Sequence, residues 1–444
     1  MSPAVKKSGA RARHAPEAAP ATPEGLEVWL DDPTFGPLTH LGRLHRSGLE
    51  SVRFEYSPLW LKNGAAFALD PELSLASGNF YPKDSNFGIF MDSCPDRWGQ
   101  TLMKRRELVE AKQQARTRRE MRPWDFFLGV QDVTRMGALR FSALQSDKQL
   151  KQGLAPELLE GQALANQALA APALTHIGEL QEVALELTRK KVDDLDLLQQ
   201  WLKVLVAPGA SLGGARPKAN LQDGLGQLWI AKFPGADDEH DWALREMLVH
   251  QLAAEYGLNV APARLERIGH GFHTFVTRRF DRHAGRRRFF TSAMAVLGRS
   301  DSEEASYLDL AEFIASKQGV EGRIEADLRE LFRRVLFNVA VSNRDDHLRN
   351  HGFMREATGW RLAPAYDMNP STKKDGHVLA LDDASTEPDL DTVVATAELY
   401  RVTPKQAQED LARLSQVIGT WQNKAQLLGL SGEDRAELKD CFLV

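Results

Sequence analysis

The sequence predicts an α+β fold with two lobes and a further α+β domain in front of them. Two stretches carry this expectation. In one, a strand-like run at 227–233 leads into a helical stretch at 240–256. In the other, a helical run at 328–339 leads into a charged loop and a short hairpin. Strands and helices that succeed one another in this way, without an internal repeat, are typical of mixed α+β proteins.

Length and composition set the broad class. The chain has 444 residues, 43% hydrophobic and 26% charged, which is enough for two or three structural units. Its two cysteines, Cys94 and Cys441, give neither a disulfide framework nor a zinc spacing. No apolar run approaches the length of a membrane span, and no secretory signal is visible. The net charge of −5 argues against binding nucleic acid by bulk electrostatics. We therefore expect a cytoplasmic protein that does not bind membranes.

The first part of the chain is expected to contain a tail, a domain and a connector. Residues 1–24 are rich in Ala, Pro, Lys and Arg and should be disordered. Residues 25–145 combine short strand-like runs with a helical stretch near 97–115, which predicts an α+β accessory domain. Residues 146–177 are rich in Ala, Gln and Leu and are expected to form a connector.

Residues 178–300 are expected to form a lobe of sheet and helix. Lys232 shares a strand face with the apolar Leu228 and Ile230, because side chains alternate along a strand. A lone Lys on such a face needs a partner, and the following helix offers Glu246. That helix is apolar on most sides, so its Glu is costly unless it is paired. We therefore predict an ion pair between Lys232 and Glu246.

A glycine-rich segment, residues 208–218, precedes this strand. Glycines let backbone N–H groups approach an anion closely, and Arg216 and Lys218 add positive charge. The segment is neither a Walker A loop nor the Gly-x-Gly-x-x-Gly loop of protein kinases. Taken alone, it is more typical of an ordinary turn than of a phosphate-binding loop.

Residues 301–444 are expected to form a mostly helical lobe that contains one charged loop. The apolar residues of 328–339 recur at helical spacing, which predicts a helix with one buried face. Asp345 therefore stands at the start of a loop on a rigid support. The hairpin that follows should bring Asn350 and Asp367 together, although seventeen residues separate them.

Asp345, Asn350 and Asp367 stand in the order in which kinases present a catalytic base and two metal ligands. Phosphoryl transfer needs this set of groups. The protein holds Mg²⁺ on the nucleotide phosphates with oxygen ligands, and it aligns an acceptor hydroxyl with a carboxylate. A solvated loop after a helix explains the charged run 343–350 equally well when that run is taken alone.

Five ordered motifs together resemble the HipA-type serine/threonine kinases of bacterial toxin–antitoxin systems. They are Ser211–Lys218, Trp229–Lys232, Arg279–Arg282, Asn343–Asn350 and Ala363–Asp367. Residues 95–99 and 135–141 are similar to that family's accessory domain, so the resemblance covers nearly the whole chain from about Leu26. It implies a two-lobed protein-kinase-like fold, with a mixed β nucleotide-binding lobe followed by a helical catalytic lobe.

The resemblance also implies ATP and Mg²⁺ as cofactors, and it implies roles for single residues. Asp345 would be the catalytic base, Lys232 the phosphate-binding lysine and His347 a group near the γ-phosphate. Asn350 and Asp367 would be the Mg²⁺ ligands. Together with Glu246 from the helix-face argument, the other nucleotide-binding residues would be Ser211, Gly213, Gly214, Ala215, Lys218, Arg278 and Phe280.

Two further points follow from the resemblance. Ser211 is expected to be autophosphorylated, because the serine at this place is modified in the family. The hinge position held here by Arg278 is often acidic in the family. Only backbone contacts with adenine are therefore expected at this residue.

The function that the resemblance implies is phosphorylation of a protein Ser or Thr by a toxin. Its partner would be a small helix-turn-helix antitoxin, and it would meet DNA only through that antitoxin. The target would be a component of tRNA charging, such as an aminoacyl-tRNA synthetase. Two alternatives stay open: a non-catalytic protein with a kinase fold that docks an antitoxin, and a small-molecule kinase of the aminoglycoside phosphotransferase kind.

Overall fold

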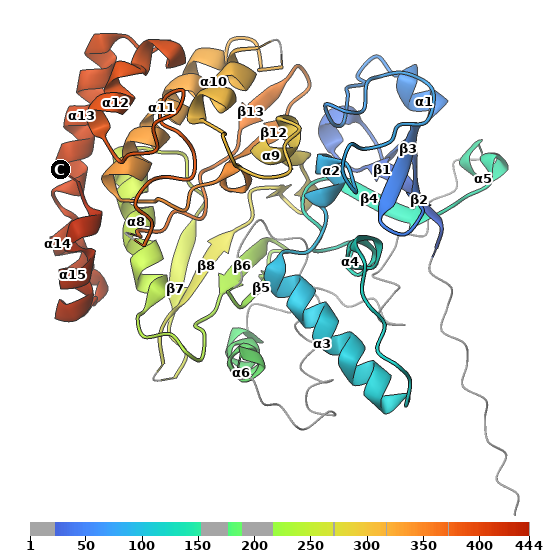
Figure 1. The fold of residues 1–444 in the computed structure, drawn as a ribbon, viewed down its shortest axis with the longest axis horizontal. Helices are drawn as coiled ribbons and strands as arrows, with labels where there is room; N and C mark the ends of the chain where they lie inside the picture. Colours follow the sequence, from blue (N-terminus) through green and yellow to red (C-terminus); the bar gives the residue numbers. More distant parts are fainter. Residues whose placement is uncertain are drawn as a thin grey trace, which may run out of the picture.

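The computed structural model describes residues 23–151, 176–188, 216–269, 271–316, 318–371 and 373–443. It has the expected α+β fold. In Figure 1 a central sheet lies between the N-terminal domain and a group of C-terminal helices. The expected disordered tail lies outside the described residues up to residue 22, and so do Ser211, Gly213, Gly214 and Ala215.

The N-terminal domain is built on a four-stranded antiparallel sheet in the order β3-β2-β1-β4. Its strands are β1 (Gly25–Leu30), β2 (Thr39–Ser47), β3 (Ser51–Tyr56) and β4 (Leu139–Ala143). The short turn η1 (Pro33–Phe35) and four helices accompany it: α1 (Pro58–Leu61), α2 (Gly88–Met91), α3 (Arg97–Gln113) and α4 (Pro123–Leu128). In β3 every second residue is buried, as expected for a strand with one face on the core.

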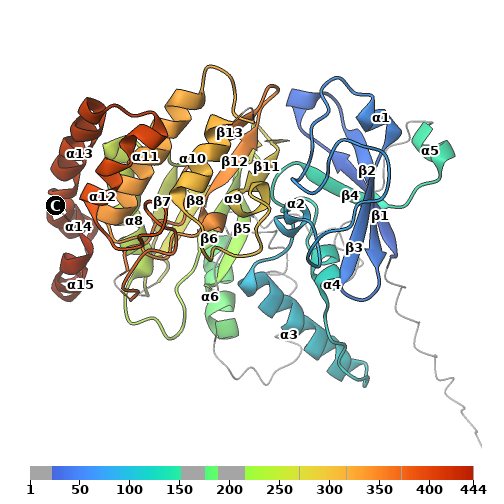
Figure 2. The same cartoon turned by 45° about the horizontal axis from the view of Figure 1, so that its top comes forward.

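The middle of the chain forms a second four-stranded antiparallel sheet in the order β5-β6-β8-β7. Its strands are β5 (Lys218–Gln222), β6 (Leu228–Lys232), β7 (Ala263–Glu266) and β8 (Thr274–Arg278). The short helix α5 (Asp147–Lys151) lies beside the N-terminal domain (Figures 1 and 2), where Asp147 pairs with Arg43 of β2. Helix α6 (Ile177–Thr188) precedes the second sheet, and the small hairpin β9 (Arg282–His283) and β10 (Arg286–Arg287) follows it. We call this unit the sheet lobe.

Helix α8 (Trp242–Tyr256) carries Glu246 and lies where the sequence predicts a helix. Asp241 caps its N-terminus by accepting a hydrogen bond from the Leu244 backbone N–H at 3.1 Å. Gly257 ends it in the left-handed conformation, with φ of +90°. Ten of the fifteen helical residues are buried, which confirms the expectation of a helix that is enclosed on most sides.

The C-terminal part is mostly helical and contains one small sheet, β11-β12-β13. The strands are β11 (Phe290–Ser292), β12 (Gly352–Arg355) and β13 (Trp360–Leu362). Its helices are α9 (Ala293–Val296), α10 (Tyr307–Ala315), α11 (Ile324–Ala340), α12 (Leu390–Ala395), α13 (Pro404–Ile418), α14 (Trp421–Leu428) and α15 (Gly432–Leu438), with the turns η3 (Leu348–Asn350), η4 (Ala397–Tyr400) and η5 (Lys439–Cys441). Because β11 pairs with β12, this sheet crosses the lobe boundary expected at residue 300.

The N-terminal domain and the sheet lobe share one hydrophobic core. Buried residues of α3, such as Trp98 and Leu102, lie in one apolar cluster with Leu180 of α6 and with Leu221 and Ala231 of the sheet. Figures 1 and 2 both show α3 beside the β5 edge of the sheet lobe. The N-terminal domain is therefore packed against the lobe that is expected to bind the nucleotide.

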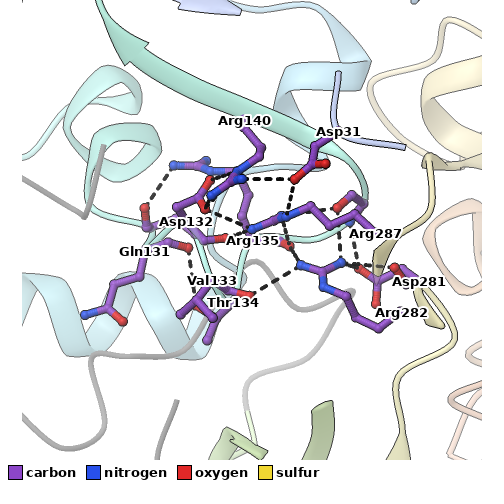
Figure 3. Close-up of polar contacts among 12 residues, drawn as sticks. Asp31, Gln131, Asp132, Val133, Thr134, Arg135, Arg140, Asp281, Arg282 and Arg287 are labelled. Atoms are coloured by element: carbon purple, nitrogen blue, oxygen red, sulfur yellow. Dashed lines mark hydrogen bonds and ion pairs between the residues drawn. The ribbon is translucent and has the colours of Figure 1, made fainter. Parts of the chain in front are cut away.

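A buried ionic network joins the same two units. Arg282 and Arg287 of the sheet lobe donate hydrogen bonds to carbonyl and carboxylate oxygens of residues 132–137 in the N-terminal domain (Figure 3). Arg279 likewise donates to the Thr134 carbonyl. Asp281 lies 2.6 Å from both Arg279 and Arg282. Burial alone would raise the pKa of Asp281, but the two arginines outweigh it and hold this pKa well below its usual value. Removing one partner would leave a buried charge unpaired, at a cost of about 3–5 kcal/mol.

Among the described residues, no helix is long and apolar enough to cross a membrane.

Candidate active site

Lys232, at the end of β6, lies in an ion-paired cluster. Its Nζ atom is 2.6 Å from Oε1 of Glu246, so the pair predicted from the helix face is present. The same Nζ atom is 2.5 Å from Oδ1 of Asp367, a contact that the sequence did not predict. Lys232 thus ties the strand and α8 to the segment after β13.

The pKa values of this cluster follow from burial and from the ion pairs. Burial favours the neutral form of Lys232, but Asp367 and Glu246 outweigh it and hold the pKa of Lys232 above its usual value. Burial would raise the pKa of Asp367, yet Lys232 lowers it below its usual value. Burial does raise the pKa of Glu246, and Lys232 offsets this only in part. The site therefore holds a charged ammonium beside the Asp367 carboxylate at neutral pH.

Asp367 adopts a backbone conformation that few residues other than Gly adopt. Its φ angle is +58°, which Asp and Asn tolerate better than most residues. The hydroxyl of the preceding residue, Tyr366, donates to the carbonyl of Arg349 at 2.7 Å. The residues just before Asp367 and just before Asn350 are therefore in direct contact, which agrees with the convergence predicted from the hairpin.

The adjacent residues Asp345 and Asp346 have opposite environments. Asp346 is buried, and its Oδ2 atom accepts hydrogen bonds from Tyr307 and Asn338 and pairs with His351 at 2.6 Å. The side chain of Asp345 is 67% exposed and pairs with Lys374. Only Asp345 is thus placed to meet an incoming hydroxyl group, whereas Asp346 supports the loop from beneath.

Asn350 and His347 have polar atoms that suit ligands. Oδ1 of Asn350 is buried and has no hydrogen-bond partner among the described residues, and neither has Nδ1 of His347. A buried carbonyl oxygen without a partner is costly unless something else satisfies it. Carboxylate and amide oxygens are the ligands that Mg²⁺ prefers, so Asn350 and Asp367 fit a magnesium site. His347 lowers the pKa of Asp367, which shows that the two residues lie near each other.

A pocket lies between the sheet lobe and the helical part of the chain. Among the site residues proposed from the sequence, those that line it are Lys218, Lys232, Glu246, Arg278, Phe280 and Asp367. Its remaining wall is largely apolar, with Ile230, Phe275, Ala365 and Met368 among the lining residues. An apolar slot with a few charged groups at one place is a typical small-molecule site.

The expected hinge, residues 278–280, lines the pocket. The ring of Phe280 lies 5.5 Å from the rings of both Phe290 and Tyr366, measured between centroids. The side chain of Arg278 is exposed. Arg279, in contrast, is buried in the ionic network that joins the sheet lobe to the N-terminal domain. The Arg278 side chain therefore lies in solvent, while its backbone N–H already donates to the Pro262 carbonyl at 2.9 Å and would have to leave that bond to meet a ligand.

Besides the contact of Lys232 with Asp367, sequence reasoning missed two further contacts of the site. Lys374, from the segment after Asp367, pairs with Asp345. Asp96, from the N-terminal domain, pairs with Lys218 at 2.8 Å. In the sequence, residues 95–99 indicate only an accessory domain, and nothing in their spacing indicates a partner 122 residues away.

Two family models match the chain in the order expected. A model of the HipA N-terminal domain matches residues 26–142, and a model of the HipA-like C-terminal domain matches residues 210–421. The chain belongs to the HipA family. Between them the two matches contain every residue of the cluster around Lys232 and both residues of the Asp96–Lys218 pair.

Curated relatives of this HipA-family chain carry kinase names. It is 28% identical over 147 residues to "Putative kinase Y4mE" of Sinorhizobium fredii, covering 31% of this chain and 33% of that protein. It is 29% identical over 182 residues to a "Putative kinase" of Haemophilus influenzae, covering 36% of this chain and 52% of that protein. The matches thus span between a third and about half of these relatives' length.

The HipA-type fold is also found among solved structures. The chain is similar to one from the Shewanella oneidensis complex of the toxin–antitoxin system HipA, HipB and its operator DNA. The TM-score is 0.62 at 17% sequence identity, and the match covers 93% of both chains. This likeness confirms the two-lobed, kinase-like α+β fold over nearly the whole chain.

Proposed function

We propose that this HipA-family chain is an ATP- and Mg²⁺-dependent serine/threonine protein kinase that acts as the toxin of a toxin–antitoxin pair. One observation carries the proposal. Lys232, paired with Glu246 and Asp367, lines a pocket. Tyr366, which also lines it, contacts the loop that carries the exposed Asp345 and an Asn350 oxygen without a partner among the described residues. A structural ion pair alone explains neither the exposed carboxylate nor the oxygen without a partner.

Each group has a role that its environment suits. Asp345 accepts the proton of the acceptor hydroxyl, because its carboxylate is exposed at the end of a supported loop. Asn350 and Asp367 hold Mg²⁺, which neutralises phosphate charge when it is bound. Lys232 and Lys218 bind phosphate oxygens, and His347 lies near the γ-phosphate. The pocket wall at residues 278–280 receives the adenine through backbone groups.

Incubation with labelled ATP and a cell lysate tests the proposal. We expect the wild-type chain to label a protein of the translation apparatus, for which an aminoacyl-tRNA synthetase is the proposed class. We also expect mass spectrometry to find phosphate on Ser211. A phosphate at this place adds about −1.5 to −2 charges and should disfavour ATP binding.

The catalytically impaired Asp345→Asn variant is the control for this experiment. It should label neither the substrate nor Ser211. Labelling of the substrate with Ser211 unmodified would contradict the autophosphorylation, and ATP binding without any transfer would favour the non-catalytic alternative. Transfer only to small molecules would favour a phosphotransferase of the aminoglycoside kind.

A small DNA-binding antitoxin is the partner that we propose. The solved relative comes from a complex of HipA, HipB and operator DNA, and the net charge of this chain is −5. A chain of that charge is poorly suited to bind DNA by itself. We place its action in the cytoplasm, where ATP and the translation apparatus are found. Tight, sequence-specific binding of operator DNA by the chain alone at physiological salt would contradict this partner.

A further inference from the structure

The link between helices α2 and α3, taken together with the first two residues of α3 (residues 92–98), reaches from the N-terminal domain to the edge of the candidate site. Asp96 caps α3 by accepting a hydrogen bond from the Gly99 backbone N–H at 2.8 Å. Its other carboxylate oxygen lies 2.8 Å from Nζ of Lys218. The indole N–H of Trp98 donates to the Lys218 carbonyl at 3.1 Å. The link therefore holds both the backbone and the ammonium group of Lys218.

Lys218 lies directly beside the phosphate-binding lysine. Lys218 of β5 and Lys232 of β6 are paired in the register of the sheet, so their side chains share one face. Like charges placed opposite each other repel. Three carboxylates offset this repulsion: Glu246 and Asp367 pair with Lys232, and Asp96 pairs with Lys218.

The Asp96–Lys218 pair is buried and lies at the edge of the candidate site. Each of the two side chains is only 6% exposed. Lys218 lines the pocket together with Lys232, and it lowers the pKa of Asp367. An ammonium that is buried to this degree keeps its position and its charge only when a carboxylate accompanies it. For Lys218 that carboxylate comes from a different domain.

The same link makes a second contact close to the catalytic loop. Asp92 is half-buried and accepts hydrogen bonds from the backbone N–H and the hydroxyl of Ser292, both at 2.7 Å. Ser292 ends β11, opposite Gly352, and the backbone N–H of the next residue donates to His351 at 2.8 Å. One segment of the N-terminal domain thus contacts both β5, whose Lys218 lines the pocket, and β11 of the C-terminal part.

We propose that Asp96 is a positioning residue of the nucleotide site, which holds the Lys218 ammonium beside Lys232 so that both lysines meet the ATP phosphates. The inference rests on the proposed ATP-binding function. It makes nucleotide affinity depend on how the N-terminal domain is seated. Because coupling is reciprocal, bound nucleotide also strengthens that seating, and a partner that displaces residues 92–98 weakens ATP binding.

The substitution Asp96→Asn separates this role from helix capping. Asn caps helices about as well as Asp, so α3 keeps its N-terminal hydrogen bond while the carboxylate charge is lost. We expect the KM for ATP to rise about tenfold with kcat within about twofold of wild type. Because the change removes one charge of a buried ion pair, the melting temperature should fall, and the kinetics are therefore compared well below it, where the variant is folded. In a Lys218→Met background the same substitution should have no further effect on KM.

A matched control is Asp389→Asn. Asp389 caps α12, and in the described part of the chain its carboxylate accepts hydrogen bonds only from residues of that helix. This control should leave KM unchanged. An unchanged KM in Asp96→Asn would overturn the inference. An equal rise in KM in both the wild-type and the Lys218→Met backgrounds would also overturn it, because Asp96 would then not act through Lys218.

A second measurement does not depend on ATP. Acylation of Lys218 by an amine-reactive reagent, followed by mass spectrometry, should be several-fold faster in Asp96→Asn than in the wild type, because the ammonium loses its ion pair with the Asp96 carboxylate. An equal rate in both proteins would contradict the inference. If the wild type binds no ATP but the labelling rates differ as expected, the proposed function fails while the pairing of Asp96 with Lys218 stands.

Discussion

Replacing Asp345 with Asn is expected to lower phosphoryl transfer by about 10²- to 10⁴-fold while ATP binding is kept, which is the usual range for loss of a general base. Asn has nearly the shape of Asp but lacks its basicity. The Asp345 side chain is 67% exposed and pairs only with Lys374 among the described residues, so the fold should not depend on its charge. Single-turnover transfer from labelled ATP, measured together with nucleotide affinity, provides the test.

The adjacent Asp346→Asn variant is the contrasting control. Asp346 is buried against His351, Tyr307 and Asn338, so this change should lower the melting temperature. We expect stability to fall in Asp346→Asn and to stay near the wild-type value in Asp345→Asn. Wild-type turnover in Asp345→Asn would remove Asp345 from its proposed role as the base.

Asp367→Asn is expected to abolish the gain in ATP affinity that Mg²⁺ provides, because the ion loses a charged oxygen ligand. Asn is chosen because the φ angle at this position is +58°, which Asn tolerates and Ala does not. ATP titrations with Mg²⁺ and with a chelator, for the wild type and the variant, measure the effect. The variant should bind ATP equally well under both conditions.

Asp382→Asn is the control for the metal prediction. Asp382 lies in the same part of the chain, and its carboxylate accepts hydrogen bonds only from the nearby Ala384 and Ser385 among the described residues. Its substitution should leave the Mg²⁺ dependence intact. A wild-type protein that binds ATP equally well with and without Mg²⁺ would take away the basis of the prediction.

Much of the site was predictable because its signals are local. Helix α11 follows from the spacing of its apolar residues, and the hairpin after it brings the segments of Asn350 and Asp367 together. The partner of Lys232 was predictable for the same reason. Glu246 is a charged residue on the enclosed helix α8 and needs a counter-ion, and the lone Lys232 on the preceding strand can supply it.

Other features of the site depend on the tertiary packing of segments that are distant in the sequence. Asp345 and Asp346 are adjacent and chemically identical, and only the packing of Tyr307, Asn338 and His351 decides which of them is buried. Nor does the sequence show that Asp367 contacts Lys232, because 135 residues separate the two.

The sequence by itself determined the order of the chemical groups: a lysine on a strand, a glutamate on a helix, and then Asp345, Asn350 and Asp367 along a loop and hairpin. It did so because periodicity and turn chemistry act over a few residues. The tertiary structure alone decided that the N-terminal domain contributes Asp96 to this site. That contact exists because α3 packs against the sheet lobe, and the docking of two domains depends on the shape and charge of whole surfaces, which no local pattern encodes.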